Sequence, residues 1–216
     1  MYQFIERFKY IVIEGPIGAG KTSLASKIAL QVGAGLILED AAQNPFLKKF
    51  YESQGQNALA TQLHFYFQRL DQLHNTDVFQ KNPHAMGDYM FGKNDIFAQL
   101  TLNEDEKNLY QRACREIVTS KNLPQPGLII WLQAPVPALL ARIRQRGIGM
   151  ERLIHENYLS RLSQAYSHFF QQYCGAPVFA VNTEKLNPID NAAHYTLLLE
   201  RLNNFRGGRE FFNPQV

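Results

Sequence analysis

The chain has 216 residues, of which 45% are hydrophobic and 19% charged, and its formal net charge is +3. These values are typical of one globular domain, and so small a charge gives no reason to expect a nucleic-acid polymer as partner. Cys114 and Cys174 lie far apart without metal-ligand spacing, so we expect reduced thiols and a cytoplasmic protein. The charged N-terminus does not resemble a signal peptide, and no apolar run is long enough to span a membrane.

The first pattern along the chain is a strand, a glycine-rich turn and a helix. The apolar, β-branched run Tyr10–Ile13 predicts a strand buried on both faces. Residues 23–30 predict a helix with Leu24 and Ile28 on one face. The turn between them fits the template G-x-x-x-x-G-K-[ST] at all its fixed positions, which are Gly15, Gly20, Lys21 and Thr22. The sequence therefore predicts a phosphate-binding loop rather than a turn without a ligand.

The residue types of this turn suit a phosphate chain. Glycines let the backbone approach the ligand closely, and the helix N-terminus adds free N–H groups and its dipole. Lys21 supplies a cation to the β- and γ-phosphates, and the Thr22 hydroxyl is placed to ligate Mg²⁺. We expect the phosphates to contact the whole loop: Gly15, Pro16, Ile17, Gly18, Ala19, Gly20, Lys21 and Thr22.

Strand and helix patterns alternate through the rest of the chain. Further strands are predicted at residues 36–38, 128–132 and 178–181, with a weak one at 84–88. Helices are predicted at residues 44–51 (Asn44 as N-cap, Pro45 first), 57–78, 96–100, 104–120, 136–145, 153–173 and 190–204. We expect an α/β fold with a doubly wound, five-stranded parallel sheet and helices on both faces. Residues 1–205 form one domain, and the tail 206–216 has no periodic pattern.

Two features of this pattern bear on function. Glu39 follows the second strand at the edge where open α/β sheets bind ligands, although Glu39 and Asp40 also fit a solvated acidic pair. The helix over 57–78 is apolar on more than one side, so it is covered by two layers or forms an interface. No N-K-x-D motif occurs, and Gln133 rather than aspartate ends the strand at 128–132. A small-molecule kinase therefore fits better than a GTPase or a motor ATPase.

Several motifs together resemble the deoxynucleoside kinase family, in particular its bacterial deoxyadenosine/deoxyguanosine kinase branch. They are the segment 14–22, Glu39, Asn44-Pro45-Phe46-Leu47 with Phe50-Tyr51, Asp88-Tyr89-Met90-Phe91 with Ile96-Phe97-Ala98, Arg142-Ile143-Arg144-x-Arg146-Gly147, and Tyr158-Leu159-x-Arg161-Leu162. The resemblance covers about residues 9–185. It implies a P-loop kinase fold with an arginine-bearing lid at about 142–152, and a homodimer through the helix 57–78. The implied activity is Mg²⁺- and ATP-dependent 5′-phosphorylation of deoxynucleosides in salvage, and the 44–47 segment resembles purine-directed members.

The resemblance also implies roles for single residues. Glu39 would accept the proton of the 5′-hydroxyl, and Tyr51 with Glu151 would hold the 3′-hydroxyl. Gln62 would grip the base edge and Phe97 would pack on the base. The acceptor site would also include Asp88, which would contact Mg²⁺ directly or through water, and lid arginines would neutralise the phosphoryl group: Arg142 on the ATP phosphates, Arg144 and Arg146 in catalysis.

Plainer interpretations of these residues remain open. Tyr51 and Phe97 also fit core aromatics, and Gln62 fits a solvated helix position. Glu151 also fits a helix cap, and the three arginines a solvated basic face.

The sequence departs from the family pattern at two positions, and two other functions remain open. Tyr89 stands where many members carry an arginine near the 5′-hydroxyl, and Ile148 where some carry a lid arginine. A thymidylate or other nucleoside-monophosphate kinase is the alternative enzyme, and it needs an arginine-rich acceptor site near Asp88. A non-catalytic nucleotide-binding module is the other alternative.

Overall fold

A computed structural model describes residues 2–53, 55–118 and 123–214. Within these residues the strands form a single parallel sheet in the order β2-β3-β1-β4-β5-β6. Ile11 of the central strand β1 lies opposite Met86 on one side and Leu128 on the other. The strands are β1 (Tyr10–Glu14), β2 (Gly35–Ile37), β3 (Ala85–Gly87), β4 (Leu128–Gln133), β5 (Val178–Asn182) and β6 (Arg209–Phe212). Because all run the same way, their carboxyl ends share one edge, where such sheets bind ligands.

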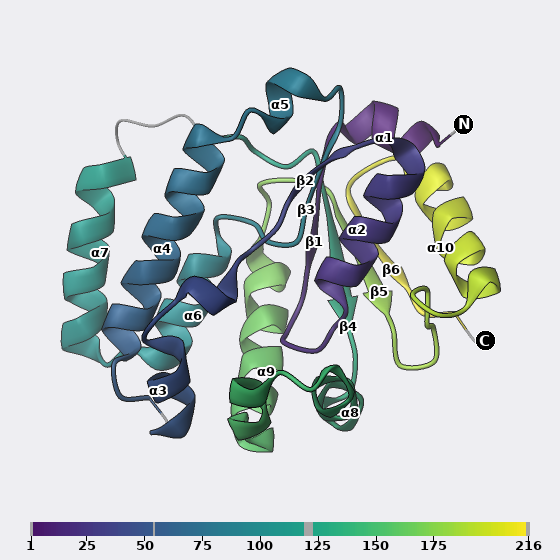
Figure 1. Cartoon of the computed structure of the whole chain (residues 1–216). Helices are drawn as coiled ribbons and strands as arrows, with labels where there is room; N and C mark the ends of the chain where they lie inside the picture. The colour runs from purple at the N-terminus through teal and green to yellow at the C-terminus, as the bar shows by residue number, and fades with distance from the viewer. Residues whose placement is uncertain (1, 54, 119–122, 215–216) are drawn as a thin grey trace.

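Helices cover both faces of this sheet, as expected of a doubly wound fold. On one side lie α1 (Gln3–Phe8), α2 (Lys21–Val32) and α10 (Ala192–Asn204) (Figure 1). On the other lie α4 (Ala58–Asn75), α6 (Lys93–Thr101), α7 (Glu104–Val118) and α9 (Glu156–Gln172). The shorter elements are η1 (Ala41–Gln43), α3 (Leu47–Glu52), α5 (Val78–Lys81), α8 (Val136–Arg146) and η2 (Gly149–Leu153). Of these, α3, α8 and η2 lie near the carboxyl edge of the sheet (Figure 1).

The core explains why the strands are so apolar. All five residues of β1 are buried, as are the first five of β4. Helix α2 packs Leu24 and Ile28 into the same core, as its periodicity predicts. None of the helices in the described ranges is long and apolar enough to cross a membrane.

The predicted P-loop α/β fold is confirmed, with one correction in the sheet: it has six strands over the described ranges rather than five. The segment expected to be an irregular tail contains β6, which pairs with β5 so that Val178 lies opposite Arg209. Its Arg-Glu-Phe-Phe sequence carries no buried apolar run, because it forms an edge strand whose residues are exposed or half-buried. The short helix α1 is also absent from the sequence prediction.

Several helix ends differ from those predicted. Helix α3 begins at Leu47, not at Pro45, because Asn44 and Pro45 form a preceding turn in which the Asn44 side chain accepts from the Phe46 N–H. The helix predicted over 57–78 ends at Asn75, where Thr76 is extended, and α5 follows separately. Helix α9 begins at Glu156 after η2. The predicted last residues of the helix 104–120 lie outside the described residues.

Candidate active site

The phosphate loop joins β1 to α2 at the carboxyl edge of the sheet. Gly15 has a φ of +148°, and a Cβ there would lie 2.5 Å from the carbonyl oxygen of Leu132. Gly18 has a φ of +84°, and its Cβ would lie 2.7 Å from the carbonyl oxygen of Leu139. Both positions therefore require glycine, which supports the reading of the motif. The Lys21 ammonium folds back onto the loop and donates to the Pro16 carbonyl at 3.1 Å.

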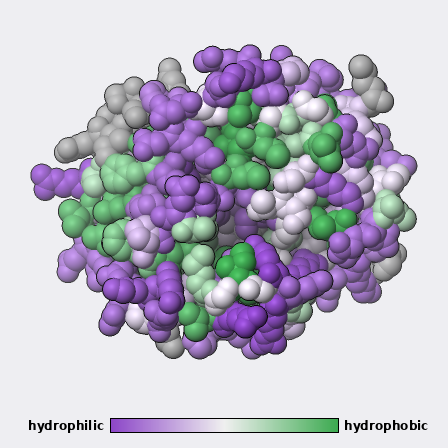
Figure 2. Space-filling view, viewed as in Figure 1, coloured by the Kyte–Doolittle hydropathy of each residue, from purple (hydrophilic) through white to green (hydrophobic). Residues whose placement is uncertain are grey.

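A cavity of about 450 Å³ lies next to this loop. Figure 2 shows the surface hollowed near the middle of this face. Twelve of the predicted site residues line the cavity, and they come from elements far apart in the chain: Gly15, Ile17, Gly18, Lys21, Thr22, Glu39, Tyr51, Gln62, Asp88, Phe97, Arg146 and Glu151. This volume is in the range of small-molecule sites.

Glu39 lies just beyond β2 and is held by two cations. Arg69 of α4 pairs with its Oε1 through Nε and through a second guanidinium nitrogen, and the Lys93 ammonium lies 2.8 Å from its Oε2. Burial alone would raise the pKa of this carboxyl, but Arg69 and Lys93 hold that pKa well below its ordinary range. The Glu39 backbone N–H donates to Asp88 Oδ1 at 2.8 Å. Glu39 is therefore an ionised carboxylate fixed at the cavity wall.

Asp88 and Thr22 meet between the phosphate loop and Glu39. The Thr22 hydroxyl donates to Asp88 Oδ2, and Asp88 follows β3 at the same edge of the sheet. A hydroxyl and a carboxylate beside a phosphate loop are the hard oxygen ligands that suit Mg²⁺, so the donor set fits this ion. No cluster of three or more His, Cys, Asp or Glu side chains suited to a metal occurs within the described ranges. Remaining Mg²⁺ ligands would thus come from phosphate oxygens and water.

Burial also affects the loop lysine. Burial and the neighbouring Lys93 lower the pKa of Lys21 to about 8, against the opposing effect of Glu14, Glu39 and Asp88. Lys21 and Lys93 therefore lie close enough to repel one another. An anionic ligand between the two cations would relieve that repulsion.

The three lid arginines have different surroundings. Arg142 donates to the Thr183 hydroxyl at 3.0 Å and to the Thr183 carbonyl, away from the cavity lining. Burial lowers the pKa of Arg142 from its ordinary value. Arg146 lies on the cavity wall and pairs with Glu151, whereas Arg144 is exposed and does not line the cavity. Of the three arginines expected at the transferring group, only Arg146 therefore lines the cavity.

Part of the cavity wall is formed by aromatic and amide side chains. One face of α4 contributes Gln62, Phe65 and Arg69, and α6 contributes Phe97. Gln62 is buried, so it is not the solvated helix residue of the plainer interpretation. Tyr51 packs edge-on against Phe50 and Tyr158, and burial raises its pKa well above 10, so its hydroxyl is a proton donor. Phe65 and Phe97 therefore offer aromatic surface to the ring of a bound ligand, and Gln62 offers it an amide.

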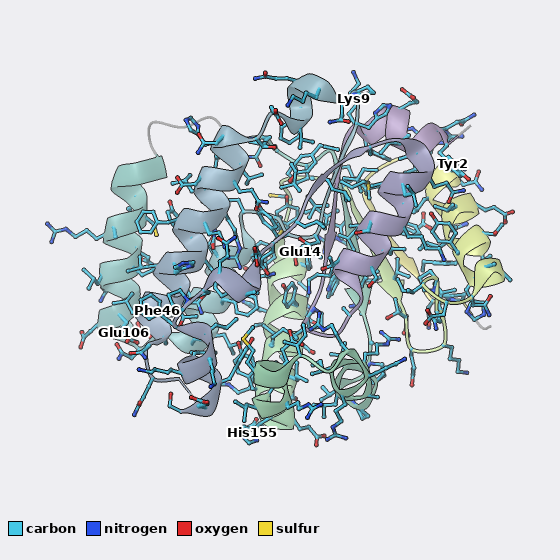
Figure 3. The ribbon with its side chains drawn as sticks, in the orientation of Figure 1. Tyr2, Lys9, Glu14, Phe46, Glu106 and His155 are labelled. Atoms are coloured by element: carbon cyan, nitrogen blue, oxygen red, sulfur yellow. The ribbon has the colours of Figure 1, made fainter. Side chains whose placement is uncertain are left out.

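A fully buried carboxylate, Glu14, has no role in the sequence prediction. It ends β1 in the interior of the molecule, while Glu106 and His155 lie at the periphery (Figure 3). Its oxygens accept from the N–H groups of Gly15 (3.0 Å) and Met90 (2.8 Å) and from the Tyr166 hydroxyl (3.0 Å). Glu14 thus ties the phosphate loop to the segment after β3 and to α9.

Sequence reasoning missed Arg69 and Lys93 as well. A signal for Arg69 was present, since Gln62, Phe65 and Arg69 follow one another at helical spacing and share one face of α4. Lys93 gave no such signal, because a single lysine at the start of a short helix is normally solvated. Only the packing of α6 against α4 and α9 brings it to the cavity.

The parallel sheet, the phosphate loop and a cavity carrying an ionised carboxylate define a P-loop kinase that transfers a phosphoryl group to a small acceptor. Residues 11–206 match the deoxynucleoside kinase family, so the chain belongs to that family and is a phosphotransferase. The resemblance seen in the motifs is therefore confirmed.

Individual relatives agree with this assignment. The deoxyguanosine kinase of Bacillus subtilis is 35% identical over 165 residues, which cover 76% of this chain and 79% of that protein. The deoxyadenosine/deoxycytidine kinase of the same organism is 24% identical over 186 residues, which cover 83% of this chain and 85% of that protein. The structure of deoxyadenosine kinase from M. mycoides with bound dCTP superposes with a TM-score of 0.76 at 23% identity, covering 91% of this chain and 100% of that one. This structural likeness shows the shared fold.

Proposed function

We propose that the chain transfers the γ-phosphoryl group of ATP to the 5′-hydroxyl of a purine deoxynucleoside, forming the monophosphate for nucleotide salvage. The observation that carries this proposal is that the phosphate loop and the Glu39 carboxylate line one cavity. A donor phosphate on the loop and an acceptor hydroxyl at Glu39 would face each other inside it. Such positioning is most of what phosphoryl transfer requires of a protein.

The proposed reaction gives a separate role to each of the side chains that line the cavity. The acceptor oxygen attacks the γ-phosphorus, its proton passes to Glu39, and the bond to the β-phosphate oxygen breaks to release ADP. Lys21 and the loop N–H groups hold the phosphate chain. Mg²⁺ held near Thr22 and Asp88 supplies charge neutralisation on the phosphate oxygens when bound. The proposal gives Glu151 and Tyr51 to the sugar 3′-hydroxyl.

The proposed preference for purines rests on the aromatic and amide side chains of the cavity wall and on the substrate named for one relative. Phe65 and Phe97 offer apolar surface to a ring, and the Gln62 amide offers a donor and an acceptor side by side. The Bacillus subtilis deoxyguanosine kinase, at 35% identity, supports a purine substrate.

We further propose that residues 142–152 act as a lid on the single domain 1–205. The segment includes the end of α8, Gly147 in the left-handed conformation (φ +74°), and η2. Ile148, Met150 and Glu151 of this segment line the cavity, so a movement here would open or close it. Arg146 would then reach the transferring group, with Arg142 and Arg144 approaching the donor phosphates on closure.

The test is ATP consumption by the purified chain against deoxyadenosine, deoxyguanosine, deoxycytidine, thymidine and the corresponding monophosphates, with and without Mg²⁺. The proposal expects the highest kcat/KM for a purine deoxynucleoside and no turnover in excess chelator. A tenfold lead of either pyrimidine, about 1.4 kcal/mol of transition-state stabilisation, overturns the purine assignment. Turnover of monophosphates alone favours the monophosphate kinase, and no turnover at all favours the non-catalytic module. Against the monophosphate kinase, Arg69 and Lys93 are both paired with Glu39 rather than free to bind an acceptor phosphate.

We also propose a cytoplasmic homodimer that pairs through α4 and its neighbour α7. Phe67 of α4 and Leu109 of α7 are exposed, and hydrophobic side chains gather on the side where these helices lie (Figure 2). Isologous packing would remove this apolar surface from water. Cys114 and Cys174 are both free thiols, as expected in a reducing compartment. Light scattering that gives a monomer mass at micromolar concentration would exclude the dimer.

A further inference from the structure

The motif resemblance implies an arginine at position 89, but this chain has a tyrosine there. Tyr89 occupies that position, is fully buried, and donates its hydroxyl to Gln72 Oε1 at 2.7 Å. It brings no positive charge to the acceptor end of the cavity. Positive charge beside Glu39 comes instead from Arg69 and Lys93, which both pair with it.

Lys93 is buried where neither its helix nor its surroundings favour a lysine. It is only 4% exposed and is the first residue of α6. A buried ammonium is costly unless it is paired, and a cation at a helix N-terminus opposes the helix dipole. The compensating contacts are Glu39 Oε2, at 2.8 Å, and the ring of Phe97, whose centroid lies 5.6 Å away. Lys93 is thus held by the active-site carboxylate.

The two oxygens of Glu39 are not equivalent. Oε1 accepts from Arg69 Nε and forms an ion pair with a second guanidinium nitrogen of Arg69, whereas Oε2 contacts only the Lys93 ammonium among the described residues. A carboxylate oxygen has about two acceptor positions, so Oε1 is filled and Oε2 keeps one. The acceptor hydroxyl therefore has a free position at Oε2, directly beside Lys93.

We propose that Lys93 is the positioning residue for phosphoryl transfer, orienting Glu39 so that Oε2 faces the acceptor hydroxyl and supplying a positive charge beside it. This inference rests on the proposed function. Lys93 acts through Glu39, while Arg69 fixes the opposite oxygen. Because Lys93 contacts the oxygen that would face the acceptor, its loss should lower kcat, whereas the loss of a purely structural ion pair should lower only stability.

A double-mutant cycle tests this role, with kcat measured for wild type, Lys93→Met, Glu39→Gln and the double variant. Lys93→Met has similar length without the charge and should lower kcat by ~10–10²-fold through misplacement of Glu39, with the KM for ATP within about threefold. In the Glu39→Gln background the same change should cost less than about threefold, because residues that act as a unit are not additive. Lys93→Arg should recover most of the activity. Lys107→Met, which removes an exposed ion pair on α7, is the matched control.

The outcomes separate this inference from the proposed function. A wild-type chain without nucleoside turnover refutes the proposed function itself. An active wild type with an unaffected Lys93→Met enzyme, or with equal losses in both backgrounds, overturns the role of Lys93 alone. Circular dichroism checks folding, and Lys93→Gln replaces Lys93→Met in the cycle if the methionine variant does not fold.

Discussion

Two glutamates at the carboxyl edge of the sheet, Glu14 and Glu39, are held in opposite ways. Glu14, at the end of β1, accepts from two backbone N–H groups and a tyrosine hydroxyl, and no lysine or arginine of the described residues pairs with it. Glu39, just after β2, is paired with Arg69 and Lys93 and lies on the cavity. The three neutral donors fix the Glu14 carboxylate in place, and Glu14 does not line the cavity. Charged partners at a cavity wall keep a carboxylate ionised and reachable.

This difference assigns the two residues to different tasks. All three contacts of Glu14 join segments of the fold around the phosphate loop, so its loss should reduce stability. Glu39 has a free acceptor position toward the cavity, so its loss should reduce turnover. Substitutions can separate the two effects because stability and kcat are measured independently.

The largest expected effect belongs to Lys21, the cation that lies near both carboxylates. Lys21→Ala should lower kcat by about 10³–10⁵-fold, the range for losing a cation that stabilises charge on the transferring group. Single-turnover measurement at saturating ATP isolates the chemical step. Lys48→Ala, which removes an exposed lysine of α3, is the control and should keep kcat within about twofold of wild type. A Lys21→Ala enzyme within tenfold of wild type would remove the loop lysine from the mechanism.

Glu39→Gln should come next, with kcat lowered by ~10²–10⁴-fold, as for loss of a general base, and ATP affinity nearly intact. The amide keeps the shape of the side chain but cannot take the proton. Asp40→Asn changes the adjacent, exposed carboxylate, which accepts from Gln43, and should leave kcat within about threefold. Equal effects of the two substitutions would favour the solvated acidic pair over a catalytic Glu39.

Glu14→Gln should act on stability instead. Its new amide N–H₂ would face one or more N–H or O–H donors, and each buried donor left without a partner costs on the order of 1–3 kcal/mol. We expect the free energy of unfolding to fall by about 3 kcal/mol, measured by urea denaturation with an unchanged m-value. Glu6→Gln alters a largely exposed carboxylate and should change the free energy of unfolding by less than about 0.5 kcal/mol. Unchanged stability with a collapsed kcat would reverse the assignment of the two carboxylates.

The same contrast explains what the sequence could and could not predict. The phosphate loop is contiguous, so its strand, glycines, Lys21 and Thr22 are readable from spacing alone. Glu39 was found because the end of a parallel strand places it at a known edge. Its partners Arg69 and Lys93 lie 30 and 54 residues further along the chain, and no local pattern records that they meet there.

The sheet shows the same limit. Strands β1 and β4 are buried on both faces and read as apolar runs. Strand β6 is an edge strand with Arg209 and Glu210, and its pairing with β5 follows from the closure of the fold rather than from its composition. Glu14 gave no signal in the sequence, because its donors are two backbone N–H groups and a tyrosine hydroxyl 152 residues away, and it resembles any polar residue at the end of a strand.

The smallest expected effect comes from the hydroxyl that completes the Glu14 site. Tyr166 is buried, and burial raises its pKa well above 10, so its hydroxyl stays protonated and donates to Glu14. Tyr166→Phe removes this one donor and leaves both backbone N–H groups in place, so the free energy of unfolding should fall by about 1–2 kcal/mol. The matched control is Tyr195→Phe, which deletes a buried hydroxyl without a hydrogen-bond partner among the described residues and should be neutral or slightly stabilising. If both substitutions cost the same by urea denaturation, the Tyr166 hydroxyl does not hold Glu14, and the carboxylate is fixed by the backbone alone.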